Sequence, residues 1–239
     1  MANMALYHLH NVKSLLRDFV SLVFPKVCLN CNEHLQKGVG HLCLRCRKDL
    51  PLNHHHKEKH NPLYNRFSYL PNVVFASSYM QFQKHGVAQK ILNQLKYKGN
   101  YEIGVELGKW FGKELQTVSI NVDCIIPIPI HKQKKRKRGY NQSLAIAEGI
   151  SSQLSVPVND FAVERIKKTS SQTNKSKLER WTNVEKIYRI NDKDAIKMKN
   201  VMIVDDVITT GATVGTLCDE LINQGVSEVY VICLATGIK

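Results

Sequence analysis

The stretch that decides the fold is Val201-Met202-Ile203-Val204-Asp205-Asp206-Val207-Ile208-Thr209-Thr210-Gly211-Ala212-Thr213. Its first four residues are apolar, which predicts a strand buried on both faces. Two carboxylates follow, then a loop of small hydroxyl residues with one glycine, and a helical pattern begins at Ala212. The order predicts an α/β protein with acids at the carboxyl end of a strand, where open α/β sheets bind their ligands.

The chemistry of this segment favours a phosphorylated ribose. Ionised Asp205 and Asp206 only accept hydrogen bonds, so they suit vicinal ribose hydroxyls or a hydrated magnesium ion. The loop over residues 209–213 offers hydroxyls and a glycine that admits close approach, and the free N–H groups of the next helix attract an anion. No Gly-Lys-Ser/Thr follows the glycine, which excludes a P-loop. Too little chain follows Asp206 for a response-regulator receiver domain, and a buried strand with an ordinary exposed turn leaves both acids without a ligand.

The segment resembles the loop of type I phosphoribosyltransferases that binds 5-phosphoribosyl 1-diphosphate (PRPP). That resemblance implies a parallel sheet with flanking helices and PRPP bound together with magnesium. Asp205 and Asp206 would contact the ribose, and the residues from Thr209 to Thr213 would cradle the 5-phosphate. The PRPP-binding residues expected from the resemblance are Asp205, Asp206, Thr209, Thr210, Gly211, Ala212 and Thr213.

Two cysteine pairs, Cys28-x-x-Cys31 and Cys43-x-x-Cys46, are separated by eleven residues. Each pair can place two thiolates on one ion, so together they predict a tetrahedral structural zinc site in a small N-terminal module. A pair of disulfides or two redox motifs are the alternatives. No secretory signal supports the first and no βαβ pattern supports the second.

A basic run precedes the acids in the chain. Six of the seven residues from Lys132 to Arg138 are basic, between a strand expected over 123–130 and an apolar helical pattern. We expect a basic loop that faces the same sheet edge as Asp205. It can neutralise a diphosphate, form a rail for nucleic-acid phosphates, or remain a solvated charge run. The candidate contacts to diphosphate or nucleic acid are Lys132, Lys134, Lys135, Arg136, Lys137 and Arg138.

The remaining patterns divide the chain into three parts. Residues 1–26 contain an amphipathic helix, residues 27–60 hold the cysteine module and a solvated histidine-rich linker, and residues 61–239 form the phosphoribosyltransferase-like domain. In that domain, a strand or hairpin is expected over 73–82 and strands over 123–130, 161–168 and 226–234. Helices are expected over 101–115 and 212–223, with another from Val87 that Gly99 ends. The polar stretch 169–177 is interpreted as a loop that closes over a substrate or as an ordinary surface loop.

The charge balance favours polyanionic partners. The chain of 239 residues carries 34 Lys and Arg against 20 Asp and Glu, a net charge of +14, which suits phosphorylated metabolites or nucleic acid. No run of 18 or more apolar residues predicts a membrane-spanning helix. Charges interrupt the N-terminal apolar positions, which argues against a signal peptide and leads us to expect a cytoplasmic protein.

The chain as a whole resembles the ComF family of late-competence, phosphoribosyltransferase-like proteins. The features that carry the likeness are the two Cys-x-x-Cys pairs, Lys96-Tyr97-Lys98-Gly99, Pro127-x-Pro129 with Arg138-Gly139-Tyr140-Asn141-Gln142, Thr169-x-x-Gln172 with Arg180-x-x-Asn183, and the PRPP-type loop. Tyr140 stands where the family more often has Phe. The resemblance implies a role in DNA uptake and natural transformation, alongside other competence proteins.

Two hypotheses remain open, and PRPP binding belongs to both. In the first, the protein handles single-stranded DNA, which the cysteine module and the basic run contact while Tyr97, Tyr101 and Tyr140 stack bases. In the second, it is an active phosphoribosyltransferase in which a nitrogen base displaces diphosphate from PRPP. The sequence favours DNA handling, because a cysteine module and a histidine-rich linker specify no nucleobase. It assigns no catalytic residue and no acceptor base.

Overall fold

The computed structural model describes residues 25–36, 38–96, 100–167 and 187–237. The chain separates into two compact units, Met1–Leu50 and Pro51–Lys239. The helix expected within residues 1–26 and the polar stretch 169–177 lie outside the described residues, apart from positions 25 and 26.

The first unit is built around the cysteines. An antiparallel bridge joins Val27 to His34, and the short helix α2 (Leu44–Lys48) begins directly after Cys43. Within its described residues, the buried apolar side chains other than cysteine are Leu42 and Leu50. Two leucines are too small a core to hold the described residues of this unit by themselves, and the four cysteines offer a cross-link.

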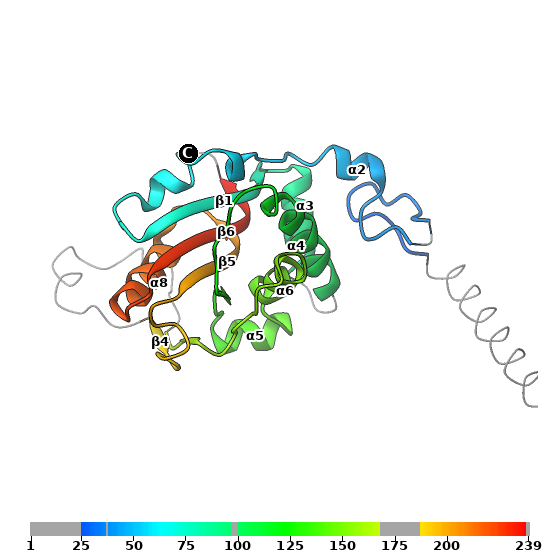
Figure 1. Cartoon of the computed structure of the whole chain (residues 1–239). Helices are drawn as coiled ribbons and strands as arrows, with labels where there is room; N and C mark the ends of the chain where they lie inside the picture. The colour runs from blue at the N-terminus through cyan, green and yellow to red at the C-terminus, as the bar shows by residue number, and fades with distance from the viewer. Residues whose placement is uncertain (1–24, 37, 97–99, 168–186, 238–239) are drawn as a thin grey trace, which may run out of the picture. The chain divides into compact units, whose positions relative to one another are not determined.

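The second unit contains a four-stranded parallel sheet, which confirms the expected fold class. Its order is β1 (Val73–Phe82), β6 (Glu228–Gly237), β5 (Asn200–Ile208) and β2 (Cys124–Pro127), and every neighbouring pair is parallel. β5 therefore lies inside the sheet, between β6 and β2 (Figure 1). Its apolar run is completely buried, as a strand covered on both faces requires.

Side chains of the strands alternate between two apolar layers, one on each face of the sheet. Val201, Ile203 and Val231 pack in one cluster with Leu217 and Leu221 of α8 (Ala212–Asn223). The other face is covered by α4 (Tyr101–Leu115) and α6 (Gln142–Leu154), with α3 (Val87–Gln94) against β1. Figure 1 shows α4 and α6 on one side of the sheet and α8 on the other. The period-2 alternation of a strand explains how one run serves both layers.

The backbones of α4 and α6 touch through glycines. A Cβ atom added at Gly108 would lie 2.2 Å from the carbonyl oxygen of Ile146, and one at Gly149 would lie 2.2 Å from that of Val105. No larger residue fits without moving a helix. This contact fixes α6, whose first turn reaches the carboxyl edge of the sheet.

The basic run is a helix, α5 (Lys132–Arg138), and the expectation of a loop was wrong. His131 caps its start by accepting the backbone N–H of Gln133 at Nδ1, and Gly139 ends it in the left-handed conformation with φ of 88°. Lys and Arg are good helix formers, and cations in the last turn complement the helix dipole. β2 is also shorter than expected, because Pro127 and Pro129 cannot donate to a ladder.

Smaller elements complete this unit. The strands β3 (Val163–Arg165) and β4 (Tyr188–Ile190) form an antiparallel pair. The 3₁₀ helices η1 (His55–Lys57) and η2 (Tyr64–Phe67) precede β1. α3 ends at Gln94 with Leu95 as its C-cap, and Gly99 lies outside the described residues. The histidine-rich stretch is not wholly solvated, since His56 is buried and faces Glu114 across 3.6 Å.

Candidate functional site

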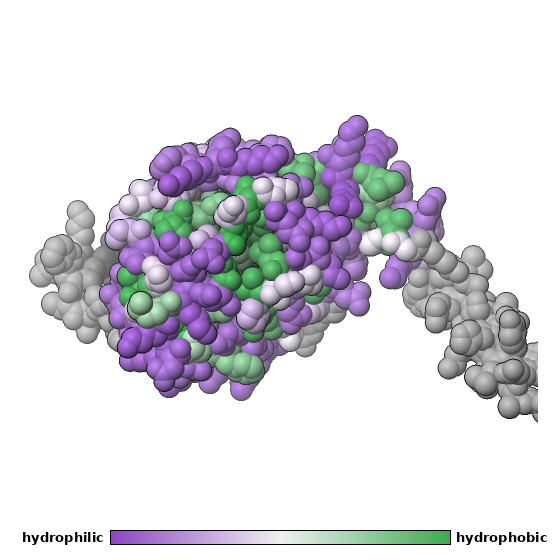
Figure 2. All heavy atoms as spheres, in the orientation of Figure 1, coloured by the Kyte–Doolittle hydropathy of each residue, from purple (hydrophilic) through white to green (hydrophobic). Residues whose placement is uncertain are grey.

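A cavity of about 440 Å³ opens at the carboxyl ends of the strands. It is lined by the end of β5, the loop that follows, and the start of α8, with α3, α5 and Arg165 on its other sides. All seven residues expected to bind PRPP lie in its wall: Asp205, Asp206, Thr209, Thr210, Gly211, Ala212 and Thr213. Figure 2 shows a hollow with hydrophobic residues inside a mostly hydrophilic surface. The structure thus brings the expected residues together around one space, and their contacts with PRPP remain predictions.

The two acids lie inside β5 rather than in the loop after it. β2 stops opposite Val204, while β5 continues along β6, with Asp205 paired to Cys233. The Oδ1 atom of Asp205 accepts hydrogen bonds from the backbone N–H of Asp206 at 2.8 Å and from the hydroxyl of Ser143 at 3.1 Å. The strand and the first turn of α6 therefore hold this carboxyl group in one orientation.

Asp205 resists ionisation in the unliganded protein. Desolvation and then the charge of Asp206 raise its pKa to about 8, against the opposing effect of the hydrogen bonds from Asp206 and Ser143. A carboxyl group of this kind gains from a nearby cation, because the cation favours the charged form. The position therefore suits a hydrated magnesium ion or a ligand that brings one.

The loop after β5 is supported by η2, which the sequence did not reveal. Gly211 has φ of +83°, and a Cβ atom there would lie 3.1 Å from the ring of Phe67. Arg66 donates to the carbonyl oxygens of Ile208, at 3.4 Å, and of Thr209, and also to the hydroxyl of Thr236 at 3.1 Å. The left-handed conformation and the aromatic ring together explain the glycine. Arg66 ties the loop to the end of β6.

Only some of the basic residues of α5 line the cavity. Lys134 and Arg138 line the cavity, whereas Lys132 forms an ion pair with Glu164. The remaining candidates, Lys135, Arg136 and Lys137, are exposed and do not line it. Helical geometry explains the division, since residues four apart share a face.

Two further residues belong to the site although no sequence pattern marked them. Ser143 supports Asp205 from the N-terminal turn of α6, and Arg165 of β3 lines the cavity. Both come from elements distant in sequence from the PRPP-type loop, so only the tertiary fold reveals them. Of the expected base-stacking tyrosines, Tyr97 lies outside the described residues, and base stacking by Tyr101 and Tyr140 stays a prediction. The hydroxyl of Tyr140 donates to the carbonyl of Leu95 at 2.5 Å, and its ring packs edge-on against Tyr101.

The four cysteines of the first unit converge on one point. Their sulfur atoms all lie within 4.8 Å of one another, and no disulfide forms, since all seven cysteines of the chain are free. Backbone N–H groups donate to the sulfurs of Cys28 and Cys43 at 3.4 Å each, and the Asn30 amide donates to Cys46 at 3.3 Å. Four thiolates with such donors fit a closed tetrahedral zinc site.

The neighbouring thiols of this cluster differ in how readily they ionise. Burial opposes ionisation of Cys28, but amide donors from Cys31, Cys43 and Asn30 outweigh it and lower its pKa to about 6. For Cys31, the amide of Glu33 favours the thiolate, yet desolvation and the neighbouring thiols raise the pKa to about 12. A divalent cation removes this conflict, because it stabilises all four thiolates at once.

The chain is similar to a phosphoribosyl transferase domain family and to competence and DNA utilization proteins. Residues 140–239 match the phosphoribosyl transferase domain family. The chain is 33% identical over 114 residues to Competence protein F of Haemophilus influenzae, covering 47% of this chain and 50% of that protein. It is 30% identical to DNA utilization protein YhgH of Shigella flexneri, covering 60% of this chain and 65% of that protein. It is 25% identical over 201 residues to Competence protein ComFC of Bacillus subtilis, covering 84% and 79%.

These similarities confirm the resemblance to the ComF family and the phosphoribosyltransferase-like fold. The matched regions span half of the Haemophilus relative and 65% of the Shigella relative. In the part of the chain that the structure describes, no helix is both long and apolar enough to cross a membrane.

Proposed function

We propose that this ComF-type chain binds PRPP with magnesium in the cavity at the end of β5 and acts on single-stranded DNA during DNA uptake. The observation that carries the first half is the convergence of all seven expected PRPP-binding residues with Lys134 and Arg138 around one space. Two acids, a hydroxyl-rich loop at a helix start and two cations match the three parts of PRPP, which are a ribose, a monophosphate and a diphosphate.

Each group of residues would have a separate task. Asp205 and Asp206 would accept hydrogen bonds from the ribose hydroxyls or hold magnesium, which supplies positive charge to the diphosphate. The loop over 209–213 would bind the 5-phosphate through its hydroxyls and the amides of α8. Arg138, held by a 2.7 Å hydrogen bond to Gln142, would bind the diphosphate together with Lys134.

The DNA half of the proposal rests on charge and on the names of the relatives. Three relatives are called competence or DNA utilization proteins, and the chain carries a net charge of +14. The exposed Lys135, Arg136 and Lys137 on α5, and the basic side chains of α2 in the cysteine unit, would contact phosphates. Other competence proteins are the expected partners.

We also propose a structural zinc ion in the cysteine unit and a cytoplasmic location. The convergent sulfur atoms support the zinc. Free thiols throughout the chain support a reducing compartment.

A second candidate function, phosphoribosyl transfer to a nitrogen base, is favoured by other residues of the same cavity. Phe82, Leu92, Gln89 and Asn93 also line it. An aromatic ring, an aliphatic group and two amides can enclose a planar base. Transfer would be established by diphosphate release that depends on an added nucleobase, and its absence with every common base would reject this alternative.

Calorimetry with PRPP and magnesium tests the ribose assignment. The double variant Asp205→Asn/Asp206→Asn should bind at least about 100-fold more weakly than wild type, because it loses both carboxyl groups that would bind the ribose or magnesium. Asp219→Asn is the matched control, since it removes an exposed carboxylate on α8. Equal affinity of the double variant and wild type would reject the assignment.

Titration of single-stranded DNA at several salt concentrations tests the second half. Replacing Lys135, Arg136 and Lys137 by alanine should weaken binding and reduce the slope of log K against log salt by roughly 2. The control replaces three exposed lysines elsewhere, Lys84, Lys90 and Lys109. An equal loss in both triple variants would leave only a general charge effect and would contradict a specific contact through α5.

A further inference from the structure

We infer that Glu164 is a positioning residue that fastens the basic helix α5 to the β3–β4 pair, and that Lys132 serves this fastening instead of contacting diphosphate. The inference rests on the proposed PRPP binding and deepens it. Although Glu164 is an acid, it would hold the cations of the cavity in place.

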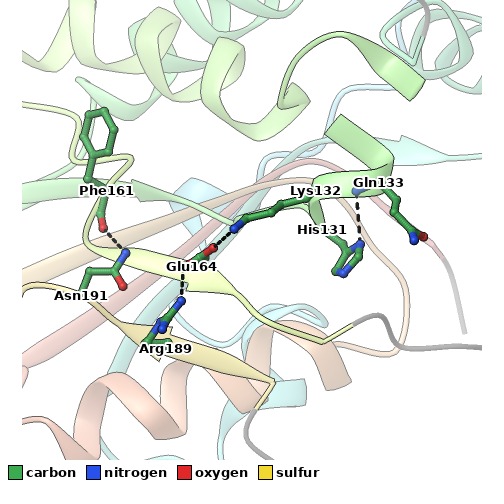
Figure 3. A network of polar contacts seen from close by, with 7 residues as sticks. All are labelled: His131, Lys132, Gln133, Phe161, Glu164, Arg189 and Asn191. Atoms are coloured by element: carbon green, nitrogen blue, oxygen red, sulfur yellow. Dashed lines mark hydrogen bonds and ion pairs between the residues drawn. The ribbon is translucent and has the colours of Figure 1, made fainter. Parts of the chain in front are cut away.

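The carboxylate of Glu164 bridges two cations from different elements (Figure 3). Its Oε1 atom lies 3.0 Å from Nζ of Lys132, at the first residue of α5, and its Oε2 atom lies 2.6 Å from Nη2 of Arg189 on β4. Each oxygen thus takes one partner. The hydrogen bonds from Arg189 and then Lys132 lower the pKa of Glu164, so the carboxylate stays charged over the physiological range.

Helix α5 depends on such polar contacts for its place. None of its seven residues is buried, so apolar packing cannot hold it against the sheet. A contact is present at each end: Lys132 with Glu164 at the start, and Arg138 with Gln142 near the end. Losing the first contact would remove the ion pair that joins the first residue of the helix to β3.

Both elements joined by Glu164 contribute cations to the cavity. Lys134 and Arg138 come from α5, and Arg165 is the next residue after Glu164 on β3. Neighbouring side chains of a strand point to opposite sides, so Glu164 can face the ion pairs while Arg165 faces the cavity. The guanidinium of Arg165 also lies 5.9 Å from the ring centre of Tyr188 on β4.

A field effect of Glu164 and a positioning role of Glu164 predict opposite changes in polyanion binding when the residue is removed. Removing an acid close to a basic cavity should strengthen the binding of a polyanion if only the electrostatic field matters. If Glu164 holds the basic elements in position, its removal should weaken binding. Similarly, a Lys132 that contacts diphosphate directly should act independently of Glu164, whereas a Lys132 that acts through the ion pair should not.

Calorimetry with PRPP and magnesium, and with inorganic diphosphate and magnesium, decides between these possibilities on the full chain. Glu164→Gln and Lys132→Gln should each weaken both ligands about fivefold, and the double variant should be no weaker than either single variant. Lys132→Arg, which keeps the ion pair, should bind as wild type does. Asp219→Asn controls for loss of one negative charge. Unchanged or tighter binding by Glu164→Gln, or additive losses in the double variant, would overturn the inference.

Amide hydrogen exchange in the absence of ligand separates this inference from the proposed function. The amides of α5 should exchange about fivefold faster in Glu164→Gln than in wild type, with no change in α8. Equal exchange in α5 would overturn the fastening whatever the ligand does. A wild-type protein that binds neither ligand would reject the proposed function, and the exchange rates would still decide whether Glu164 fastens the helix.

Discussion

The two units of this chain reach a defined structure by opposite means. In the cysteine unit, two buried leucines and four convergent sulfur atoms are the main interior contacts of the described residues. In the second unit, a parallel sheet is covered on both faces by apolar side chains, and α4 and α6 touch backbone to backbone. We therefore expect the first unit to depend on a metal for stability and the second to depend on its own packing.

Removing zinc should have the largest effect, and it should unfold the first unit alone. Structural zinc supplies about 10–16 kcal/mol of apparent binding free energy in small zinc modules. We expect a zinc-selective chelator, or Cys28→Ser with Cys46→Ser, to unfold residues 25–50 while the second unit keeps its affinity for PRPP with magnesium. Hydrogen exchange by region measures the unfolding, and calorimetry measures the affinity. Protection that persists in the cysteine unit after metal removal would contradict the comparison.

A methyl group between α4 and α6 should have the next largest effect, in the second unit alone. Gly108→Ala places a Cβ atom against the carbonyl of Ile146, and we expect a loss of about 3 kcal/mol in the free energy of unfolding. Lys109→Ala, at the exposed next residue, should change stability by less than about 0.5 kcal/mol. Urea unfolding measures both variants, with zinc content as the readout for the first unit. Lost zinc in Gly108→Ala would show that the units are not independent.

A buried amide should also matter more than its position in a polar stretch suggests. Asn61 donates to the carbonyls of His55, Glu58 and Ala76, and its oxygen accepts from the amides of Leu63 and Tyr64. Asn61→Ala leaves these groups without their partner, and we expect a loss of about 2 kcal/mol in urea unfolding. Asn65→Ala, on η2, is the comparison. Equal stability of the two variants would contradict a structural role for this amide.

The smallest expected effect is the release of a proton when PRPP and magnesium bind. Because the pKa of Asp205 is about 8 in the free protein, and a bound cation lowers it, binding of PRPP with magnesium at pH 7 should release up to about one proton. Affinity should therefore rise with pH and level off above about pH 8. Calorimetry in buffers of different ionisation enthalpy counts the protons. Asp205→Asn removes this release, and a wild-type protein that releases none would contradict the role of the cation.

The regular elements were predictable because their patterns are local. The strand 73–82 and the helices 101–115 and 212–223 have the limits that the sequence predicts. Their apolar residues recur with the period of one secondary structure, and tertiary contacts only reinforce it. The same holds for the two Cys-x-x-Cys pairs, whose spacing already indicates that their sulfur atoms can meet.

One error of prediction is local: six neighbouring cations favour a loop from Lys132 to Arg138, but the cap at His131 and the glycine at 139 define a helix there. The other unpredicted features depend on polar contacts over long distances in sequence. Ser143, Arg165 and Arg66 reach the site only after the sheet and its helices have formed. No periodicity marks such residues, since each is brought to the site by tertiary contacts.

The glycine contact between α4 and α6 has a consequence for how precisely Asp205 is oriented in the cavity. Side chains can change rotamer to absorb a small displacement, but a carbonyl against an α-carbon cannot. The hydroxyl of Ser143 is carried on the helix fixed in this way, and it orients one oxygen of Asp205. The orientation of that carboxyl group thus depends on main-chain geometry in the interior of a helix pair, where even one added carbon atom should displace it.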